Sequence, residues 1–469
     1  MMRITEESTT IFPYRRRMPT CRSITFSAVL AAASLPTMSF AWAEPPLPVI
    51  PSAVFNVTNY GAVGDGTTTD TAAIQNAINA ASAAGGGTVL VPDSGLGVYM
   101  AGALKLSSNI NLDVAGGATL EMLAKSQYGS GSTDFISANN VSNTEISGSG
   151  IIDGNGSTWW SDPSSSRPFL VNIQNSSTVA VDNITLENSP MEHLTFNNTS
   201  NVTINGITIS APSNSPNTDG IDPSGSNYLI ENSTISTGDD DIAIKPQNAA
   251  CNNIVINNMT IGSGHGISVG GQTNDGLNGM TVSNITFNGT SNGLRLKAGA
   301  GYGGLVQNVS YSHITMTNVA MPIAITSFYE NGSDNFPTDP TAVTAATLNS
   351  TTPLWKNISF DGITATGATQ DGLIYGEPLT GIGAPPTNFN GLSISNVNIS
   401  GYKGMGVYYV QNLELGAGNT FLAQSGPGLS TYSDTLAVPD PSTWALLTLG
   451  SLILFCGDKF LPPRSKIRT

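Results

Sequence analysis

Four short segments between residues 217 and 297 set the architecture of this chain: Asp219-Gly-Ile-Asp222, Asp240-Asp-Ile-Ala-Ile-Lys245, His265-Gly-Ile-Ser-Val269 and Asn292-Gly-Leu-Arg-Leu-Lys297. Each segment is short and strand-like, with a polar residue two positions before its first aligned apolar residue. When those apolar residues (Ile221, Ile242, Ile267 and Leu294) are aligned, the polar residues form one column: Asp219, Asp240, His265 and Asn292. The column collects most of the titratable groups of this region.

A second motif recurs between these segments, at Ile204–Ile209, Ile230–Ile235, Ile256–Ile261 and Val282–Phe287. The third residues of the motif are each 26 positions apart: Gly206, Asn232, Asn258 and Asn284. A fixed period of this size is typical of a solenoid. Apolar and polar residues alternate within each unit, and Asn, Gly and Ser separate the units, which indicates strands joined by turns. The sequence therefore predicts an all-β protein, a right-handed parallel β-helix.

Stacking of coils brings distant residues together in such a fold. Neighbouring coils lie about 4.8 Å apart, so Asp219, Asp240 and His265 are expected on three successive coils in one line. Arg295 and Lys297 follow the inward Leu294 by one and three positions, which aims both out of the coil. Strict alternation would turn the Asp219, Asp240 and His265 column inward, so we expect a bend or bulge at these positions.

The same residues carry a family resemblance. The motifs Asn217-Thr-Asp-Gly-Ile-Asp222, Gly238-Asp-Asp-Asp-Ile-Ala-Ile-Lys245, Gly264-His-Gly266 and Arg295-Leu-Lys297 resemble the four ordered motifs of the polygalacturonases, glycoside hydrolase family 28. The resemblance runs from about Phe55 to Leu415 and implies a pectin-lyase-like solenoid. Asp241 departs from the family pattern, because many relatives have a neutral residue there, and a third consecutive carboxylate can disturb the titration of its neighbours.

The resemblance implies a role for each catalytic candidate. Asp239 would be the general acid, and Asp219 with Asp240 would hold and deprotonate the attacking water. His265 would tune the acid and orient the sugar. The family inverts the configuration at the cleaved carbon. The residues themselves support glycoside hydrolysis, because one carboxylic acid must protonate the leaving oxygen while another carboxylate activates water or attacks the sugar. Repulsion between adjacent carboxylates is expected to raise the pKa of one of them.

The resemblance also implies substrate-binding residues, namely Arg295, Lys297, Tyr329 and Asn217. Cations are scarce in this chain, which has a net charge of −15. Outside the two ends there are eight Lys and Arg residues: Lys105, Lys125, Arg167, Lys245, Arg295, Lys297, Lys356 and Lys403. Three of the eight, Lys245, Arg295 and Lys297, fall in the four segments. Cations placed beside the acids favour an anionic polysaccharide, and an Arg fork binds a uronate carboxylate well. Lys245 has an alternative role, an ion pair with Asp222.

Three functions remain open from the sequence. The leading prediction is hydrolysis of α-1,4-linked galacturonan in pectin, with endo or exo attack and a rhamnogalacturonan or xylogalacturonan backbone left open. A calcium-dependent pectate lyase would share the fold and the acidic substrate, and a non-catalytic surface or adhesion protein would leave the clustered acids unexplained. The acidic net charge argues against nucleic acid as a partner. No His/Cys spacing indicates zinc and no phosphate loop is present, so we expect no metal and no cofactor. The protein is also expected to be a monomer.

The two ends of the chain carry separate signals. Residues 1–43 read as a signal peptide, with arginines before an apolar run and Ala41-Trp-Ala43 as the cleavage site, which predicts an exported protein. Residues 437–469 contain Val438-Pro-Asp-Pro, an apolar run and a basic tail, and resemble the Pro-Glu-Pro sorting signals that an exosortase processes in Gram-negative bacteria. A simple membrane anchor is the alternative. The β-helix domain then spans residues 44–436, and the protein is expected to be secreted or held at the cell surface.

Several residues within this domain have two interpretations. Asp70 offers an N-cap for a helix with an apolar stripe (Ile74, Ala77, Ile78, Ala81) that would cover the first coil. Trp159 and Trp160 are either a sugar-stacking platform or a packed loop. His193 is predicted to be a satisfied buried histidine rather than a groove residue. Cys251 stands alone in the domain, which excludes an internal disulfide, and is expected to be a buried turn residue.

Overall fold

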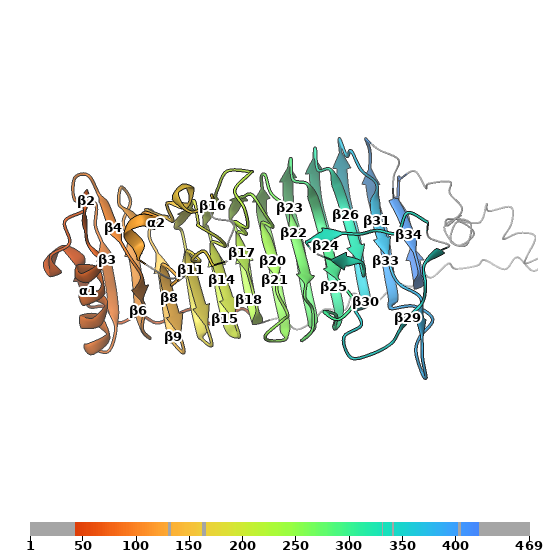
Figure 1. Ribbon diagram of the computed structural model, residues 1–469, viewed down its shortest axis with the longest axis horizontal. Coiled ribbons are helices and arrows are strands. Elements are labelled where there is room, and N and C mark those ends of the chain that lie inside the picture. Colours follow the sequence, from red (N-terminus) through yellow and green to blue (C-terminus); the bar gives the residue numbers. More distant parts are fainter. Residues whose placement is uncertain are drawn as a thin grey trace, which may run out of the picture. The chain divides into compact units, whose positions relative to one another are not determined.

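The computed structural model describes residues 43–129, 133–161, 166–330, 332–339, 342–401 and 405–421. These residues form the predicted all-β solenoid, a right-handed parallel β-helix whose strands stack in chain order (Figure 1). The predicted signal peptide, except Ala43, and the predicted C-terminal sorting segment lie outside the described residues. No helix within the described ranges is long and apolar enough to cross a bilayer.

One face of the described solenoid is an eleven-stranded parallel sheet that carries the four segments. Its strands are β5 (Leu104–Lys105), β8 (Ile136–Asn139), β11 (Val171–Gln174), β14 (Leu194–Asn197), β17 (Ile221–Asp222), β20 (Ile242–Ile244), β22 (Ile267–Gly271), β24 (Asn292–Ala298), β26 (Met321–Thr326), β31 (Gly372–Tyr375) and β34 (Met405–Tyr408). The register pairs Ile221 with Ile242, Ile242 with Ile267, and Ile267 with Leu294. This confirms the alignment predicted from the sequence.

The other long sheet contains twenty strands among the described residues and carries the 26-residue motif. Its strands are β1 (Val54–Asn56), β2 (Asp65–Thr69), β3 (Gly87–Val91), β4 (Val98–Ala101), β6 (Ile110–Val114), β7 (Thr119–Met122), β9 (Ser142–Ser147), β10 (Ile151–Asp153), β12 (Ser177–Asp182), β13 (Thr185–Glu187), β15 (Thr199–Asn205), β16 (Thr208–Ser210), β18 (Gly225–Glu231), β19 (Thr234–Ser236), β21 (Cys251–Ile261), β23 (Leu277–Asn288), β25 (Leu305–Thr317), β30 (Leu354–Thr366), β33 (Phe389–Ile399) and β35 (Val410–Leu415). Two short pairs stand apart, β27 (Tyr329–Glu330) with β28 (Ser333–Asp334) and β29 (Ala346–Thr347) with β32 (Leu379–Thr380).

The turn residues of the 26-residue motif explain its composition. Gly206, Asn232, Asn258 and Asn284 have φ of 67°, 54°, 54° and 56°, in the left-handed region that Gly and Asn tolerate best. The Asn258 side-chain amide donates to Asn232 Oδ1 on the neighbouring coil at 2.7 Å. Each Asn therefore supplies both the backbone conformation of the turn and a hydrogen bond to the preceding coil.

An amphipathic helix covers the first coils, as predicted. Helix α1 (Thr71–Ala83) buries Ile74, Ala77 and Ile78, and it contacts β1 and β3 (Figure 1). Asp70 occupies the N-cap position, but its carboxylate accepts hydrogen bonds from Val63 N (2.7 Å) and Gly64 N (3.1 Å) instead of a helix amide. Asp70 of the predicted Thr69-Asp70 pair is therefore the N-cap residue, but its carboxylate binds the preceding loop and makes no capping bond to the helix. The other helices are α2 (Lys125–Tyr128) and the 3-10 turns η1 (Val57–Tyr60) and η2 (Gly156–Thr158).

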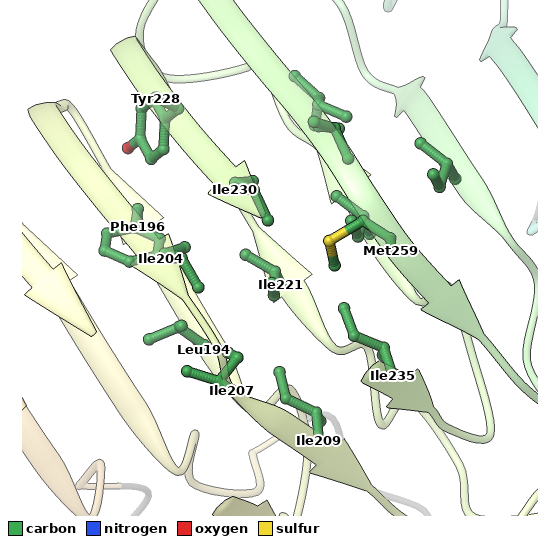
Figure 2. Packing of buried hydrophobic residues seen from close by; sticks show 14 of the residues in the cluster. Leu194, Phe196, Ile204, Ile207, Ile209, Ile221, Tyr228, Ile230, Ile235 and Met259 are labelled. Atoms are coloured by element: carbon green, nitrogen blue, oxygen red, sulfur yellow. The ribbon is translucent and has the colours of Figure 1, made fainter. Parts of the chain in front are cut away.

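Aliphatic side chains from both sheets fill the solenoid interior. Leu194 and Ile221 enter from the eleven-stranded sheet, and Ile204 and Ile230 from the twenty-stranded sheet (Figure 2). All four are completely buried. Cys251 is also buried and unpaired, and burial raises the pKa of its thiol to about 12. It begins strand β21, so its prediction as a turn residue is wrong although its burial is confirmed.

Candidate active site

The predicted acid column lies in the turns that lead into the eleven-stranded sheet. Asp219 and Asp240 precede β17 and β20, and His265 precedes β22. Strict alternation fails here because two successive amides, Asp241 N (3.0 Å) and Ile242 N (3.2 Å), donate to the single carbonyl of Gly266. An extra residue of this kind is typical of a β-bulge, which re-aims side chains at the end of a strand. The acids therefore face one another at the sheet edge instead of entering the core.

Asp240 forms the most highly connected part of this site. Its Oδ1 accepts from Arg295 Nη2 at 2.5 Å and from Ser268 Oγ at 3.0 Å, and its Oδ2 accepts from Lys297 Nζ at 2.7 Å. Burial opposes ionisation of this carboxyl. The charges of Arg295 and then Lys297 outweigh burial and hold the pKa of Asp240 well below its usual range. Asp240 is thus a carboxylate at any pH at which the protein works.

Asp239 and His265 form a second pair, more open to solvent. His265 Nδ1 lies 3.0 Å from Asp239 Oδ1, and the two side chains are 39% and 26% exposed. Burial favours the neutral form of Asp239, but the hydrogen bond from His265 lowers its pKa below the ordinary value. The same hydrogen bond raises the pKa of His265. The shared proton therefore resides mainly on His265.

Asp219 and Asp222 share Lys245. The Lys245 ammonium lies 3.0 Å from Asp219 Oδ2 and 2.9 Å from Asp222 Oδ2. The predicted pair with Asp222 is confirmed, and the contact with Asp219 is an addition. Burial raises the pKa of Asp219 and Asp222 even though Lys245 opposes the shift. The raised pKa was expected at the carboxyl that donates the proton, but the pKa of the candidate acid Asp239 is lowered. It is the pKa of Asp219 that is raised, with burial as the main cause and repulsion as a lesser one.

Arg295 and Lys297 point out of the coil, as predicted, while Leu294 and Leu296 enter the core. Both cations form ion pairs with Asp240. Arg295 also donates to Ser268 Oγ at 3.1 Å, and its Nη1 lies 3.5 Å from Asp334 on β28. Lys297 Nζ lies 5.0 Å from the ring centre of Tyr329, which places Tyr329 beside the acids.

Asn217 also reaches the site. It has φ of 55°, and its side-chain amide approaches Asp239 Oδ2 at 3.5 Å. Its Oδ1 accepts from Arg167 Nη2 at 2.6 Å, and Arg167 Nη1 donates to the carbonyls of Pro190 and Pro216. Arg167 therefore positions the loop that presents Asn217. Sequence reasoning missed this role, because Arg167 and Asn217 lie 50 positions apart and share no motif.

Asp241 is completely buried and does not face the other acids. Its Oδ2 accepts from Gly266 N at 2.9 Å, and its Oδ1 lies 3.3 Å from Thr237 Oγ1. Burial raises the pKa of Asp241 well above its usual value. The side chain ties the turn of Asp239 and Asp240 to the turn of His265. Asp241, the third consecutive carboxyl of the sequence, therefore connects two turns inside the protein and does not line the acid cluster.

The structure shows the surroundings of His193, Trp159 and Trp160, for which the sequence allowed two interpretations. His193 is buried, with Nδ1 3.0 Å from Asp219 O and Nε2 accepting from Ser189 N, and burial lowers its pKa to about 4. The satisfied-histidine prediction is confirmed. Trp159 is 3% exposed and packs edge-on against Tyr128, and Trp160 Nε1 donates to Ser189 O. The packed-loop interpretation therefore holds for Trp159.

A metal ion fits this site poorly. Ligand atoms of Asp239, Asp240 and His265 lie within 4.8 Å of one another. Both oxygens of Asp240, however, already face the cations Arg295 and Lys297, and His265 Nδ1 is engaged with Asp239. A divalent cation would have to displace or repel these charges, so we assign no metal to the cluster.

The comparisons with known proteins agree on one family. The sequence profile of the glycosyl hydrolases family 28 matches residues 84–417. An endo-polygalacturonase of Pectobacterium carotovorum subsp. carotovorum is 34% identical over 329 residues, covering 63% of this chain and 78% of the relative. The solved polygalacturonase of Erwinia carotovora ssp. carotovora superposes with a TM-score of 0.62 at 28% identity, covering 83% and 98% of the two chains. An exopolygalacturonase of Thermotoga maritima shares the fold, with a TM-score of 0.66 at 21% identity over 81% and 96%.

Proposed function

The chain belongs to family 28 of the glycosyl hydrolases, and on that basis we propose that it cleaves the α-1,4 bonds of galacturonan at Asp219, Asp239 and Asp240 by a water-mediated, inverting displacement. It is a glycoside hydrolase of the polygalacturonase type, and its substrate is polygalacturonate. The observation that carries the assignment of roles is the different surroundings of its three acids. One acid shares a proton with a histidine, one is buried against a lysine, and one is held ionised by two cations.

The Asp239–His265 pair is the proton donor in this proposal. The pair holds one proton across the 3.0 Å contact between His265 Nδ1 and Asp239 Oδ1. When the glycosidic oxygen arrives, Asp239 takes this proton and passes it to the leaving oxygen, and His265 becomes neutral. The pair is the most solvent-exposed part of the acid cluster, which suits a group that must touch the substrate.

Asp219 and Asp240 divide the work on the attacking water. A base accepts a proton more readily when its pKa is raised, and of the two carboxyls only Asp219 has a raised pKa. Asp219 therefore takes the proton of the water. Asp240 stays ionised, holds the water in place and stabilises positive charge that develops on the sugar.

Arg295 and Lys297, with Tyr329 and Asn217, bind the galacturonate at the cleaved bond. The supporting geometry is the convergence of these residues on Asp239 and Asp240. Asn217 comes from the preceding coil, and Arg295, Lys297 and Tyr329 come from later coils. A substrate carboxylate then shares the two cations with Asp240, with the Arg fork providing paired N–H donors.

Digestion of polygalacturonate with and without a chelator tests the reaction. We expect reducing ends to accumulate at the same rate in both, with no ultraviolet absorbance from an unsaturated product. Proton NMR of the first-formed reducing end should show the β-anomer. Chelator-sensitive absorbance would instead indicate a calcium-dependent lyase, and initial α-anomer would require a covalent intermediate on one of the aspartates.

We also propose that the chain is exported and then sorted at the cell surface. The support is the arginine-flanked apolar run and Ala41-Trp-Ala43 in residues 1–43, together with the Pro-Asp-Pro motif, apolar run and basic tail of residues 437–469. N-terminal sequencing and intact mass of the chain from a Gram-negative host with an exosortase should show cleavage after Ala43 and loss of the tail. An uncut cytosolic chain would contradict export.

A further inference from the structure

A groove beside the acids has a chemistry that differs from the site itself. It encloses about 270 Å³ and is lined by β11, β14, β17 and the segment after β20, with Phe169, Asn172, Glu192, Phe196, Asp222 and Lys245 among its walls. These strands precede or border β20 and β22, so the groove lies on the N-terminal side of Asp239 and His265. Arg295 and Lys297 on β24 lie on the other side.

The lining residues that the structure describes offer no positive charge free of a carboxyl partner. Lys245 is the one cation among its lining residues, and its ammonium already contacts Asp219 and Asp222 at 3.0 and 2.9 Å. Two acids, Glu192 and Asp222, line the same space. A free uronate carboxylate placed here would meet carboxyl groups and an ammonium that is already shared between two of them.

Two acid oxygens at this groove are not compensated. Glu192 Oε2 and Asp222 Oδ1 are buried and have no hydrogen-bond partner among the described residues. Burial, and then the charge of Asp219, raises the pKa of Glu192 to about 8, so a nearby positive charge does not offset its desolvation. The remaining lining is amide and aromatic, including Asn172, Phe169 and Phe196. Such walls hydrogen-bond hydroxyls and pack against apolar sugar faces.

We infer that this groove binds a sugar unit without a free carboxylate, either a methyl-esterified galacturonate or a neutral sugar. The inference rests on the proposed galacturonan hydrolysis and adds a substrate preference to it. The bond is cut between an uncharged unit held in the groove and a charged unit held by Arg295 and Lys297. The preferred polymer is accordingly a partly esterified or partly neutral galacturonan.

Three polymers test this inference: fully de-esterified polygalacturonate, randomly methyl-esterified polygalacturonate, and polygalacturonate in which part of the carboxyls has been reduced to neutral alcohols. Mass-spectrometric sequencing of the products locates the uncharged units. We expect them to be enriched at one fixed position relative to the cleaved bond and excluded from the position across that bond. Enrichment with the ester alone assigns the methyl ester, and equal enrichment with both polymers assigns any uncharged unit.

A charge variant provides the second measurement. Glu192→Gln keeps the shape and removes the negative charge that Glu192 gains above its pKa of about 8. Above that pH the ratio of kcat/KM on de-esterified to esterified polymer should therefore rise about tenfold, the effect of about 1.4 kcal/mol. Glu231→Gln on β18 of the other sheet is the matched control and should leave the ratio unchanged. An even distribution of uncharged units, or equal ratios in both variants, would overturn the inference. Failure of wild type on every polymer would instead refute the proposed hydrolysis.

Discussion

Replacement of Lys297 by Met tests whether the cations near the acids stabilise the folded protein. The Lys297 side chain is 5% exposed, and its ammonium lies 2.7 Å from Asp240 Oδ2. Breaking a buried ion pair typically costs about 3–5 kcal/mol, because a buried charge loses its partner. Asp240 retains Arg295 at 2.5 Å in this variant. We therefore expect a smaller loss of unfolding free energy, about 2–3 kcal/mol.

The pH dependence of this loss has a definite sign. The pKa of Asp240 is lowered in the folded protein, so the stability that it contributes is fully present above its ordinary value of 3.8 and is lost as the pH falls below it. In the Lys297→Met variant the pKa of Asp240 is lowered less than in the wild type, because only Arg295 of the two cations remains beside it. The difference between variant and wild type should therefore be largest at neutral pH and should shrink when the pH falls below 3.8.

Urea unfolding at pH 7 and at a pH below 3.8 measures both effects. Met fills much of the volume of the Lys stem and keeps a favourable contact with the Tyr329 ring, so lost packing contributes little. Lys356→Met is the matched control, because Lys356 is exposed on β30 of the other sheet. Exposed sites usually change stability by less than about 0.5 kcal/mol. If the two variants unfold alike at pH 7, Lys297 does not stabilise Asp240 and the reasoning fails.

Further predictions concern the acids and Arg295. Asp239→Asn should lower the hydrolysis rate by more than the roughly 10²–10⁴-fold credited to one acid, since the carboxylates act jointly. The circular dichroism spectrum should be unchanged. The control Asp275→Asn, at an exposed site, should keep full activity. Arg295→Gln should raise KM on polygalacturonate, with about 2–5 kcal/mol lost, and an equal effect on fully esterified polymer would exclude a carboxylate-binding role. Asp241→Ala should lose about 1–3 kcal/mol of stability because Gly266 N loses its acceptor, whereas Asp241→Asn should restore most of it; identical melting of the two variants would argue against that hydrogen bond.

The fold was predictable because its determinants are local and periodic. Strand alternation has a period of two and the coil a period of 26, so aligning Ile221 with Ile242 and Ile267 gives the inter-strand register directly. The Asn turns follow the same rule, since the left-handed conformation of Asn232 favours its residue type whatever surrounds it. The Asn turn can be read within one coil, whereas the register follows from comparing the short motifs of successive coils.

Side-chain partners were predicted less well, because they depend on rotamers and on neighbouring coils. The alignment placed Asp240 in one column with His265, and only the family resemblance linked His265 to Asp239. Neither showed that His265 holds the proton. It also missed Glu192, which stands next to His193 and reaches the groove, and Asp334, which approaches Arg295 from a hairpin. Neither residue belongs to a repeat, so only the three-dimensional arrangement identifies them.

The balance of charge at the site connects these observations to substrate binding. Five carboxylates face four basic groups among the described residues. Asp219 and Asp222 share Lys245, and Asp239 has His265. Asp240 has Arg295 and Lys297, and Asp334 also approaches Arg295. A substrate carboxylate adds a negative charge for which no separate cation is reserved. It must share Arg295, whose 3.5 Å contact with Asp334 is the longest of its ion pairs and the easiest to exchange. The protonated form of His265 maintains this balance, and the raised pKa of His265 extends it above the ordinary value of 6.5. Above that pKa the cluster gains net negative charge and loses its proton donor at the same time, so anion binding and proton donation should weaken together.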